Sequence, residues 1–178
     1  MRPRPTSRIR QGNAALIAVL AGALLAAAAP GAHADEDMIA VRQITPELAR
    51  EIAWKAMQSC RKHGYQVTVA VVDRAGILQV LMRDTLAAPY TIQIAQEKAH
   101  AVILSGVSSG EFVRNRSDIR MEMDHVKGII MLRGGLPIRA AGMLVGAVGV
   151  AGAPGGDKDE ACARAGLNAV RERLDFAQ

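Results

Sequence analysis

Two histidines beyond residue 34 could ligate a metal ion. His125 ends the segment MEMDH (residues 121–125), so two thioethers and two carboxylates lie close to its imidazole in the sequence. Imidazole and thioether groups both serve as axial ligands of haem iron, and the segment therefore marks His125 as a candidate iron ligand. His100 lies in a predicted helix, where its ring could turn toward a pocket or toward solvent. The competing interpretation is that the methionines fill a core or an interface.

Other chemical templates match poorly. The sequence has no H-E-x-x-H motif, no phosphate loop and no C-x-x-C pair. A metal site built from Glu122, Asp124 and His125 converges poorly unless the segment is a loop. The two cysteines, Cys60 and Cys162, could form a disulfide if their helices run antiparallel, and two small buried thiols are the alternative. No catalytic residue is therefore assigned.

The first 34 residues read as a secretory signal peptide. Four arginines precede an Ala/Leu-rich run, and Ala-His-Ala at residues 32–34 supplies a small-residue cleavage pattern. Of 22 basic and 17 acidic residues in the chain, four basic and no acidic ones lie in this segment, which leaves 18 against 17. This balance and the scarcity of aromatic residues argue against nucleic-acid binding. No later apolar run is long enough for stable membrane insertion after cleavage. The length that remains is enough for one domain, residues 45–178, which should follow a flexible arm at residues 35–44.

Hydrophobic periodicity and turn residues predict an α+β fold, because strands come in hairpin-connected groups and not in alternation with helices. The central strand, residues 143–150, is apolar on both faces, and its glycines at 146 and 149 suggest a bend or the close approach of another segment. In the first half we expect a helix at 46–61, a hairpin of strands 67–73 and 77–82, a helix at 90–104 and a capped short helix to about 116. A loop with about one helical turn should follow at 117–127. In the last part we expect a strand starting at 129–132, a Gly-Gly turn, the central strand, and a helix capped by Asp157 and Glu160 that ends near 174.

Four motifs appear in an order that resembles the GlcG/HbpS-like family. They are Arg83-Asp84, IAQEKAHA at 94–101, RGGLPI at 133–138, and GAVGVAG at 146–152 followed by Asp159-Glu160. The resemblance implies a single profilin-like domain, with an antiparallel sheet flanked by helices, that assembles into homo-oligomers. It also implies binding of haem (heme) or a related tetrapyrrole, as in some exported members. This chain departs from the usual pattern by carrying His100 where the family has a small or aromatic residue, and Arg133 where it has glycine.

The resemblance also indicates a binding region. It places the helix that carries Glu97 and Lys98 beside the Gly-Gly-x-Pro turn. A lysine charge near backbone N–H groups could hold a carboxylate such as a porphyrin propionate, and an arginine could do so with two hydrogen bonds. The alternative is a solvated Lys–Glu face with an exposed turn arginine. The candidate cofactor-binding residues are therefore His125, His100, Lys98, Glu97, Arg133, Gly134, Gly135 and Pro137, with His125 and His100 as candidate metal ligands.

We therefore expect a periplasmic or secreted, oligomeric small-molecule-binding protein whose ligand is haem or a related tetrapyrrole. One alternative is a small-molecule enzyme, or an accessory protein of an oxidative catabolic pathway, that uses Lys98 and Glu97 over the glycine-rich turn. The other alternative is an oligomeric scaffold without a ligand.

Overall fold

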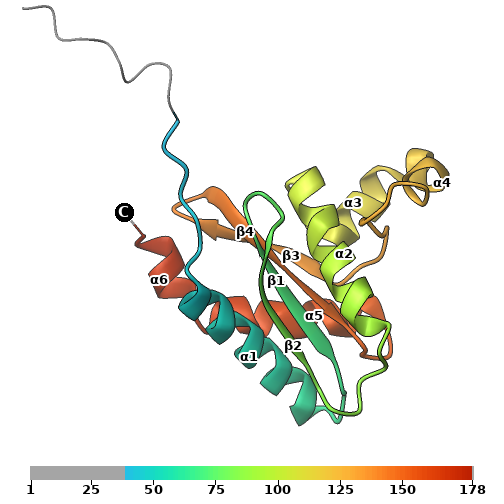
Figure 1. Ribbon diagram of the computed structural model, residues 1–178, viewed down its shortest axis with the longest axis horizontal. Coiled ribbons are helices and arrows are strands. Elements are labelled where there is room, and N and C mark those ends of the chain that lie inside the picture. The colour runs from blue at the N-terminus through green and yellow to red at the C-terminus, as the bar shows by residue number, and fades with distance from the viewer. Residues whose placement is uncertain (1–38, 178) are drawn as a thin grey trace, which may run out of the picture. The chain divides into compact units, whose positions relative to one another are not determined.

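The computed structural model describes residues 39–177. The chain divides into one unit over residues 1–40 and a compact unit over residues 41–178, so the predicted signal peptide and the start of the predicted arm lie outside the described residues. The elements of the compact unit, shown in Figure 1, are α1 (Pro46–Lys62), β1 (Thr68–Asp73), β2 (Leu78–Arg83), α2 (Thr91–Ser105), α3 (Ser109–Asn115), the 3-10 turn η1 (Ser117–Ile119), α4 (Arg120–Met123), β3 (Gly135–Ala140), β4 (Met143–Ala151), α5 (Gly156–Asn168) and α6 (Arg171–Asp175).

The four strands form one antiparallel sheet in the order β2-β1-β4-β3. This arrangement confirms the expected α+β fold and the central position of β4, where Val150 pairs with Val69 of β1 and Val148 pairs with Leu136 of β3. Pro137 lies in β3, at the edge of the sheet, where its missing N–H is tolerated.

Both faces of the sheet are covered by helices. Large side chains of the strands, such as Val69 and Val148, pack in one core with α1 and α5. The other face carries small residues and packs against α2. A Cβ placed on Gly149 would lie 2.0 Å from the carbonyl oxygen of Ala95 in α2. The glycine therefore permits close contact between helix and sheet, and the expected close approach at β4 is confirmed.

A disulfide joins Cys60 in α1 to Cys162 in α5, with the two Cα atoms 5.4 Å apart. The two helices run antiparallel, because Gly166, one turn after Cys162, packs against Ile52 and Ala56 in the preceding turns of α1. The sequence allowed either a disulfide or two buried thiols, and the structure contains the disulfide. Such a bond is typical of proteins in oxidising compartments. Within residues 39–177, no helix has the length and apolar character needed to cross a membrane.

Two details of the β3–β4 region differ from the sequence prediction. Residues 129–132 do not begin a strand: Met131 packs against Phe112 of α3 and Ala101 of α2, and the chain then turns with a hydrogen bond from Leu132 N to Ile130 O. Gly134 precedes β3 and Gly135 is its first residue, so this glycine pair does not form the turn between strands. That turn is made by residues 141 and 142, both of which have positive φ.

The last helix also differs from the prediction. The residue before α5 is Gly155, with no side chain capping the helix, and Glu160 is drawn instead toward two arginines described below. The helix ends at Asn168, where buried Val170 turns the chain into the short helix α6. The predicted capping role of Asp157 and Glu160 is therefore wrong.

Candidate functional site

A hollow of about 590 Å³ lies between α2 and residues 124–130, which we call the His125 loop. Its volume is within the range of small-molecule pockets in proteins. Its lining combines one imidazole, charged groups of both signs and several aliphatic side chains: Gln93, Glu97, Asp124, His125, Val126, Lys127, Gly128, Ile129 and Ile130. The hollow can therefore accept a ligand with apolar faces and polar edges.

The His125 loop begins where α4 ends. The N–H groups of His125 and Val126 bond to the carbonyls of Glu122 and Met123, which closes one further turn, and Gly128 at φ +83° redirects the chain. His125 is exposed, and its ring forms no hydrogen bond or ion pair with any residue that the structure describes. The imidazole is therefore free to accept a ligand.

The two methionines near His125 have different surroundings. Met121 is 81% exposed, whereas Met123 packs against the cluster around Phe112. Filling the core, the alternative raised by the sequence, therefore describes Met123 and not Met121. Among residues 39–177, no group of three or more histidine, cysteine, aspartate or glutamate side chains is placed to hold a metal ion.

The ring of His100 does not point freely into a pocket. Its Nδ1 lies 2.8 Å from the carbonyl oxygen of Gly128, and its Nε2 lies 3.0 Å from the carbonyl oxygen of Gly76. Both nitrogens therefore have backbone partners, so neither offers a free lone pair to a metal in this arrangement.

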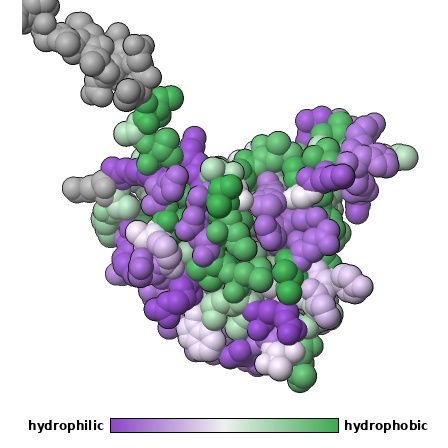
Figure 2. All heavy atoms as spheres, in the orientation of Figure 1, coloured by the Kyte–Doolittle hydropathy of each residue, from purple (hydrophilic) through white to green (hydrophobic). Residues whose placement is uncertain are grey.

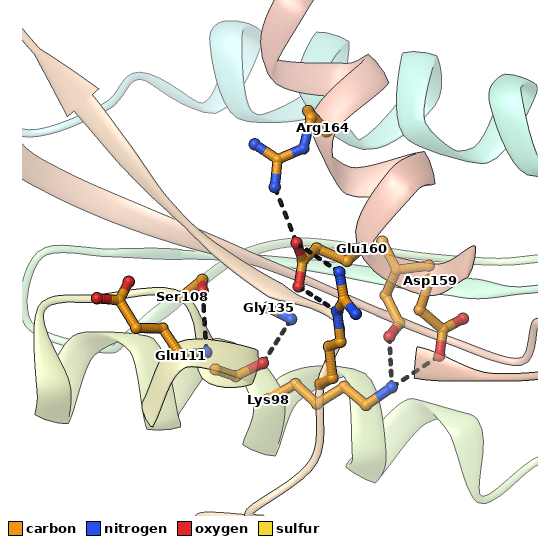
Figure 3. A network of polar contacts seen from close by, with 10 residues as sticks. Lys98, Ser108, Glu111, Gly135, Asp159, Glu160 and Arg164 are labelled. Atoms are coloured by element: carbon orange, nitrogen blue, oxygen red, sulfur yellow. Dashed lines mark hydrogen bonds and ion pairs between the residues drawn. The ribbon is translucent and has the colours of Figure 1, made fainter. Parts of the chain in front are cut away.

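Lys98 is buried in an ion pair. It is 3% exposed, and its Nζ lies 2.7 Å from Asp159 Oδ2 and 2.9 Å from the carbonyl oxygen of Val150 (Figure 3). Asp159 in turn accepts a hydrogen bond from the N–H of Ala153. Burial raises the pKa of the Asp159 carboxyl, and Lys98 lowers it by less, so the net shift is upward. The lysine thus joins α2 to the start of α5 and is not a solvated charge.

Arg133 pairs with Glu160 through two hydrogen bonds, of 2.7 and 3.3 Å, and Arg164 binds the same carboxylate from one turn later in α5. Burial would raise the pKa of Glu160, but the two arginines offset this, and its pKa is lowered from the usual value. The Arg133 side chain remains 46% exposed. It can therefore reach a ligand only in competition with Glu160.

The glycines beside Arg133 serve packing. A Cβ on Gly134 would lie 2.8 Å from Lys98 Nζ, and one on Gly135 would lie 2.5 Å from the Lys98 carbonyl oxygen. The N–H of Gly135 donates to the Ser109 hydroxyl at 2.8 Å (Figure 3). These contacts seat the start of β3 directly on α2.

The sequence candidates fall into separate places. His125 and Glu97 line the first hollow, whereas Lys98 and Arg133 line a second one of about 470 Å³ beside the start of α5. Pro137 lines a smaller hollow of about 170 Å³ near α6. Lys98 and Glu97 therefore do not face one common pocket, as the enzyme alternative requires.

Sequence reasoning missed three features at this site. Asp159 and Glu160, the partners of Lys98 and Arg133, were read as part of a motif and a helix cap. Ser108 was predicted to cap the short helix that ends near 116, and the structure confirms that cap, but the match of residues 106–110 (GVSSG) to the G-x-S-x-G nucleophile pattern was missed. Ser108 follows a helix and not a strand, and its Oγ caps α3 by accepting from Glu111 N at 3.2 Å, so the context of that motif is lacking.

Comparisons with known proteins agree with this fold. A protein-family model described as "Haem degrading protein HbpS-like" matches residues 44–168. Protein GlcG of Escherichia coli strain K12 is 29% identical over 107 residues, which cover 60% of this chain and 80% of GlcG. A double mutant of Streptomyces reticuli HbpS is 35% identical, with a TM-score of 0.72 over 81% of this chain and 98% of that chain. Klebsiella pneumoniae protein ORFY, 23% identical, has the same fold with a TM-score of 0.70, over 75% of this chain and 94% of that one.

Proposed function

Because the chain belongs to the HbpS-like family, we propose that it is an exported protein that binds haem or a related tetrapyrrole in the hollow beside the His125 loop. His125 is the proposed iron ligand. The observation that carries the proposal is this exposed imidazole, which has no partner among residues 39–177, in a hollow of ligand size. Bound haem would supply an iron centre, and the imidazole of His125 would hold it.

The rest of the lining suits such a ligand. Val126, Ile129 and Ile130 offer apolar contact to a flat macrocycle, and the Lys127 ammonium offers a partner for a propionate. The carboxylates of Glu97 and Asp124 would oppose propionates placed next to them, so the acidic edge of the ligand should lie toward Lys127. A structural neighbour, 19% identical, is described as a PduOC:Heme complex, which agrees with the proposal.

Export and self-assembly are parts of the same proposal. The disulfide between Cys60 and Cys162 supports an oxidising location, periplasmic or secreted. Figure 2 shows an apolar band over β2, an edge strand; Leu78 and Leu81 on it, and Ile77 just before it, are each at least one-third exposed. An apolar sheet edge of this kind favours pairing with another chain, and we infer a second copy as that partner. A monomer in light scattering would contradict this part.

The test of haem binding is an absorbance titration of the purified protein with hemin. We expect a saturable, shifted Soret band that is lost or displaced in His125→Ala and retained in His63→Ala, a matched change at an exposed histidine after α1. Iron-free protoporphyrin provides a second comparison, because it can occupy the hollow without ligation. Binding of hemin that is unchanged in His125→Ala would contradict the ligand assignment, and no saturable binding would contradict the function.

The family description favours haem degradation as a second candidate function. The same titration, followed over time, separates the two. A stable Soret band supports binding alone, whereas progressive loss of the band in the protein, beyond that of free hemin, supports degradation.

A further inference from the structure

The 170 Å³ hollow near α6 gathers positive charge at the free edge of β3. Three arginines line it, and each comes from a different element: Arg139 from β3, Arg164 from α5 and Arg171 from α6. Among the described residues that line it, Asp175 is the one acidic group, so three arginines against one aspartate give a net charge of +2. Residues 35–178 together hold 18 basic and 17 acidic residues, so the charge of this hollow exceeds that of the whole segment.

The turn between β3 and β4 fixes the walls of this hollow. The N–H of Ala141 in that turn donates to the carbonyl oxygen of Leu174 in α6, at 3.0 Å. The guanidinium of Arg139 donates to the carbonyl oxygen of Gly142 in the same turn, at 3.1 Å, and to that of Gly106 at the end of α2, at 2.6 Å. Arg139 and α6 are therefore held to one another through the fold.

Most of the hydrogen-bond donors on the three arginines remain available. Each guanidinium has five N–H donors. Within residues 39–177, Arg139 uses the two bonds just described, Arg164 donates once to Glu160 at 2.8 Å (Figure 3), and Arg171 donates once to Asn168 Oδ1 at 3.0 Å. A ligand in the hollow can therefore receive hydrogen bonds from all three without displacing a protein partner.

A simpler explanation covers only part of this arrangement. Charged side chains and proline on an edge strand discourage pairing with another strand, which accounts for Arg139 and Pro137 in β3. It does not account for Arg164 and Arg171, which lie on helices and line the same hollow.

We propose that this arginine hollow is a second ligand site, which binds a compact divalent oxyanion. Guanidinium groups match the paired oxygens of phosphate and carboxylate with two parallel hydrogen bonds. The volume of 170 Å³ equals that of about six water molecules at about 30 Å³ each, so it accepts inorganic phosphate or a short dicarboxylate and not a tetrapyrrole. Two negative charges on the ligand balance the net charge of the lining.

The site is independent of the proposed haem site. No described residue lines both this hollow and the one beside the His125 loop. The second copy inferred at β2 would lie at the opposite edge of the sheet from β3, so that pairing leaves the arginine hollow open.

The test is isothermal titration calorimetry of the purified protein with inorganic phosphate and, separately, with malonate. Chloride keeps the ionic strength constant, so general screening does not change. We expect saturable binding at one site. Arg171→Gln should weaken it about tenfold or more, the size of one charge-assisted hydrogen bond. Arg50→Gln makes the same change of charge at an exposed position of α1 and should bind like the wild type.

Arg139→Gln tests the site from a second element and should weaken binding by a similar factor. Circular dichroism of each variant without anion checks that it is folded. Tighter binding of phosphate or of malonate identifies which source of the oxyanion the site prefers. No saturable binding of either anion would overturn the proposal, and so would equal losses in Arg171→Gln and Arg50→Gln or wild-type affinity in both hollow variants.

Discussion

Replacing Lys98 with methionine should show that this residue stabilises the fold and does not serve the ligand. The substitution keeps the length of the side chain and removes its charge, which leaves Asp159 3% exposed without the ammonium that lies 2.7 Å away. Removing one partner of a buried pair typically costs about 3–5 kcal/mol. The carbonyl of Val150 also loses its lysine donor, so we expect the free energy of unfolding to fall by an amount in that range.

This loss should depend on pH in a defined direction. Burial already raises the pKa of Asp159 despite Lys98, and removing the lysine raises it further. A carboxyl whose folded-state pKa is raised stabilises the protein below its unfolded pKa and loses that contribution as pH rises through the folded value. The difference between Lys98→Met and the wild type should therefore be largest at pH 8 and should shrink on acidification, as Asp159 becomes protonated.

Urea unfolding at a series of pH values measures both effects. Arg173→Met is the matched control, because it removes a cation from an exposed pair with Glu51, where little stability is expected to change. Hemin binding by the folded Lys98→Met protein should equal that of the wild type. An unchanged free energy of unfolding, together with lost hemin binding, would refute the structural role.

Three further outcomes follow from the same contacts. Reduction of the Cys60–Cys162 disulfide opens a loop with a sequence separation of 102 and should lower the free energy of unfolding by about 4.7 kcal/mol; equal urea midpoints with and without reductant would contradict this. Gly149→Ala places a methyl group against the backbone of α2 and should cost about 3 kcal/mol or more, and a thermal melt like that of the wild type would show that the helix moves freely. Glu160→Gln should make stability fall less steeply at acidic pH. A carboxyl with a lowered pKa stabilises the protein above its unfolded pKa and loses that contribution as pH falls through the folded value, and the glutamine cannot lose it. An acid limb as steep as that of the wild type, measured by urea unfolding, would contradict this prediction.

The sheet could be predicted where the sequence carries redundant signals. Residues 67–73 are a β-branched run followed by a turn with Gly76 at positive φ, so propensity and turn chemistry agree. Residues 129–132 carry only a short apolar run, which suits a strand or a packed loop equally well. Packing against Phe112, a contact distant in sequence, decided in favour of the loop.

Partners were harder to predict than residue types. Lys98 was selected as a possible ligand contact, yet it shares the buried face of α2 with Ala95 and Val102, and that spacing could have indicated a buried lysine in need of a carboxylate. Which carboxylate pairs with Lys98 depends on how α5 packs against the sheet, and the sequence alone does not predict that packing. The same holds for His100, whose two carbonyl partners come from a turn and a loop that only the fold brings together.

The central claim is that His125 presents its imidazole to haem iron in the hollow beside α2. The most direct measurement is the difference spectrum between wild-type and His125→Ala protein at equal, saturating hemin. The account predicts a Soret band of imidazole-ligated haem in the wild type that disappears in the variant, while the folded state of the two proteins is the same by circular dichroism. Identical spectra for the two proteins would contradict it.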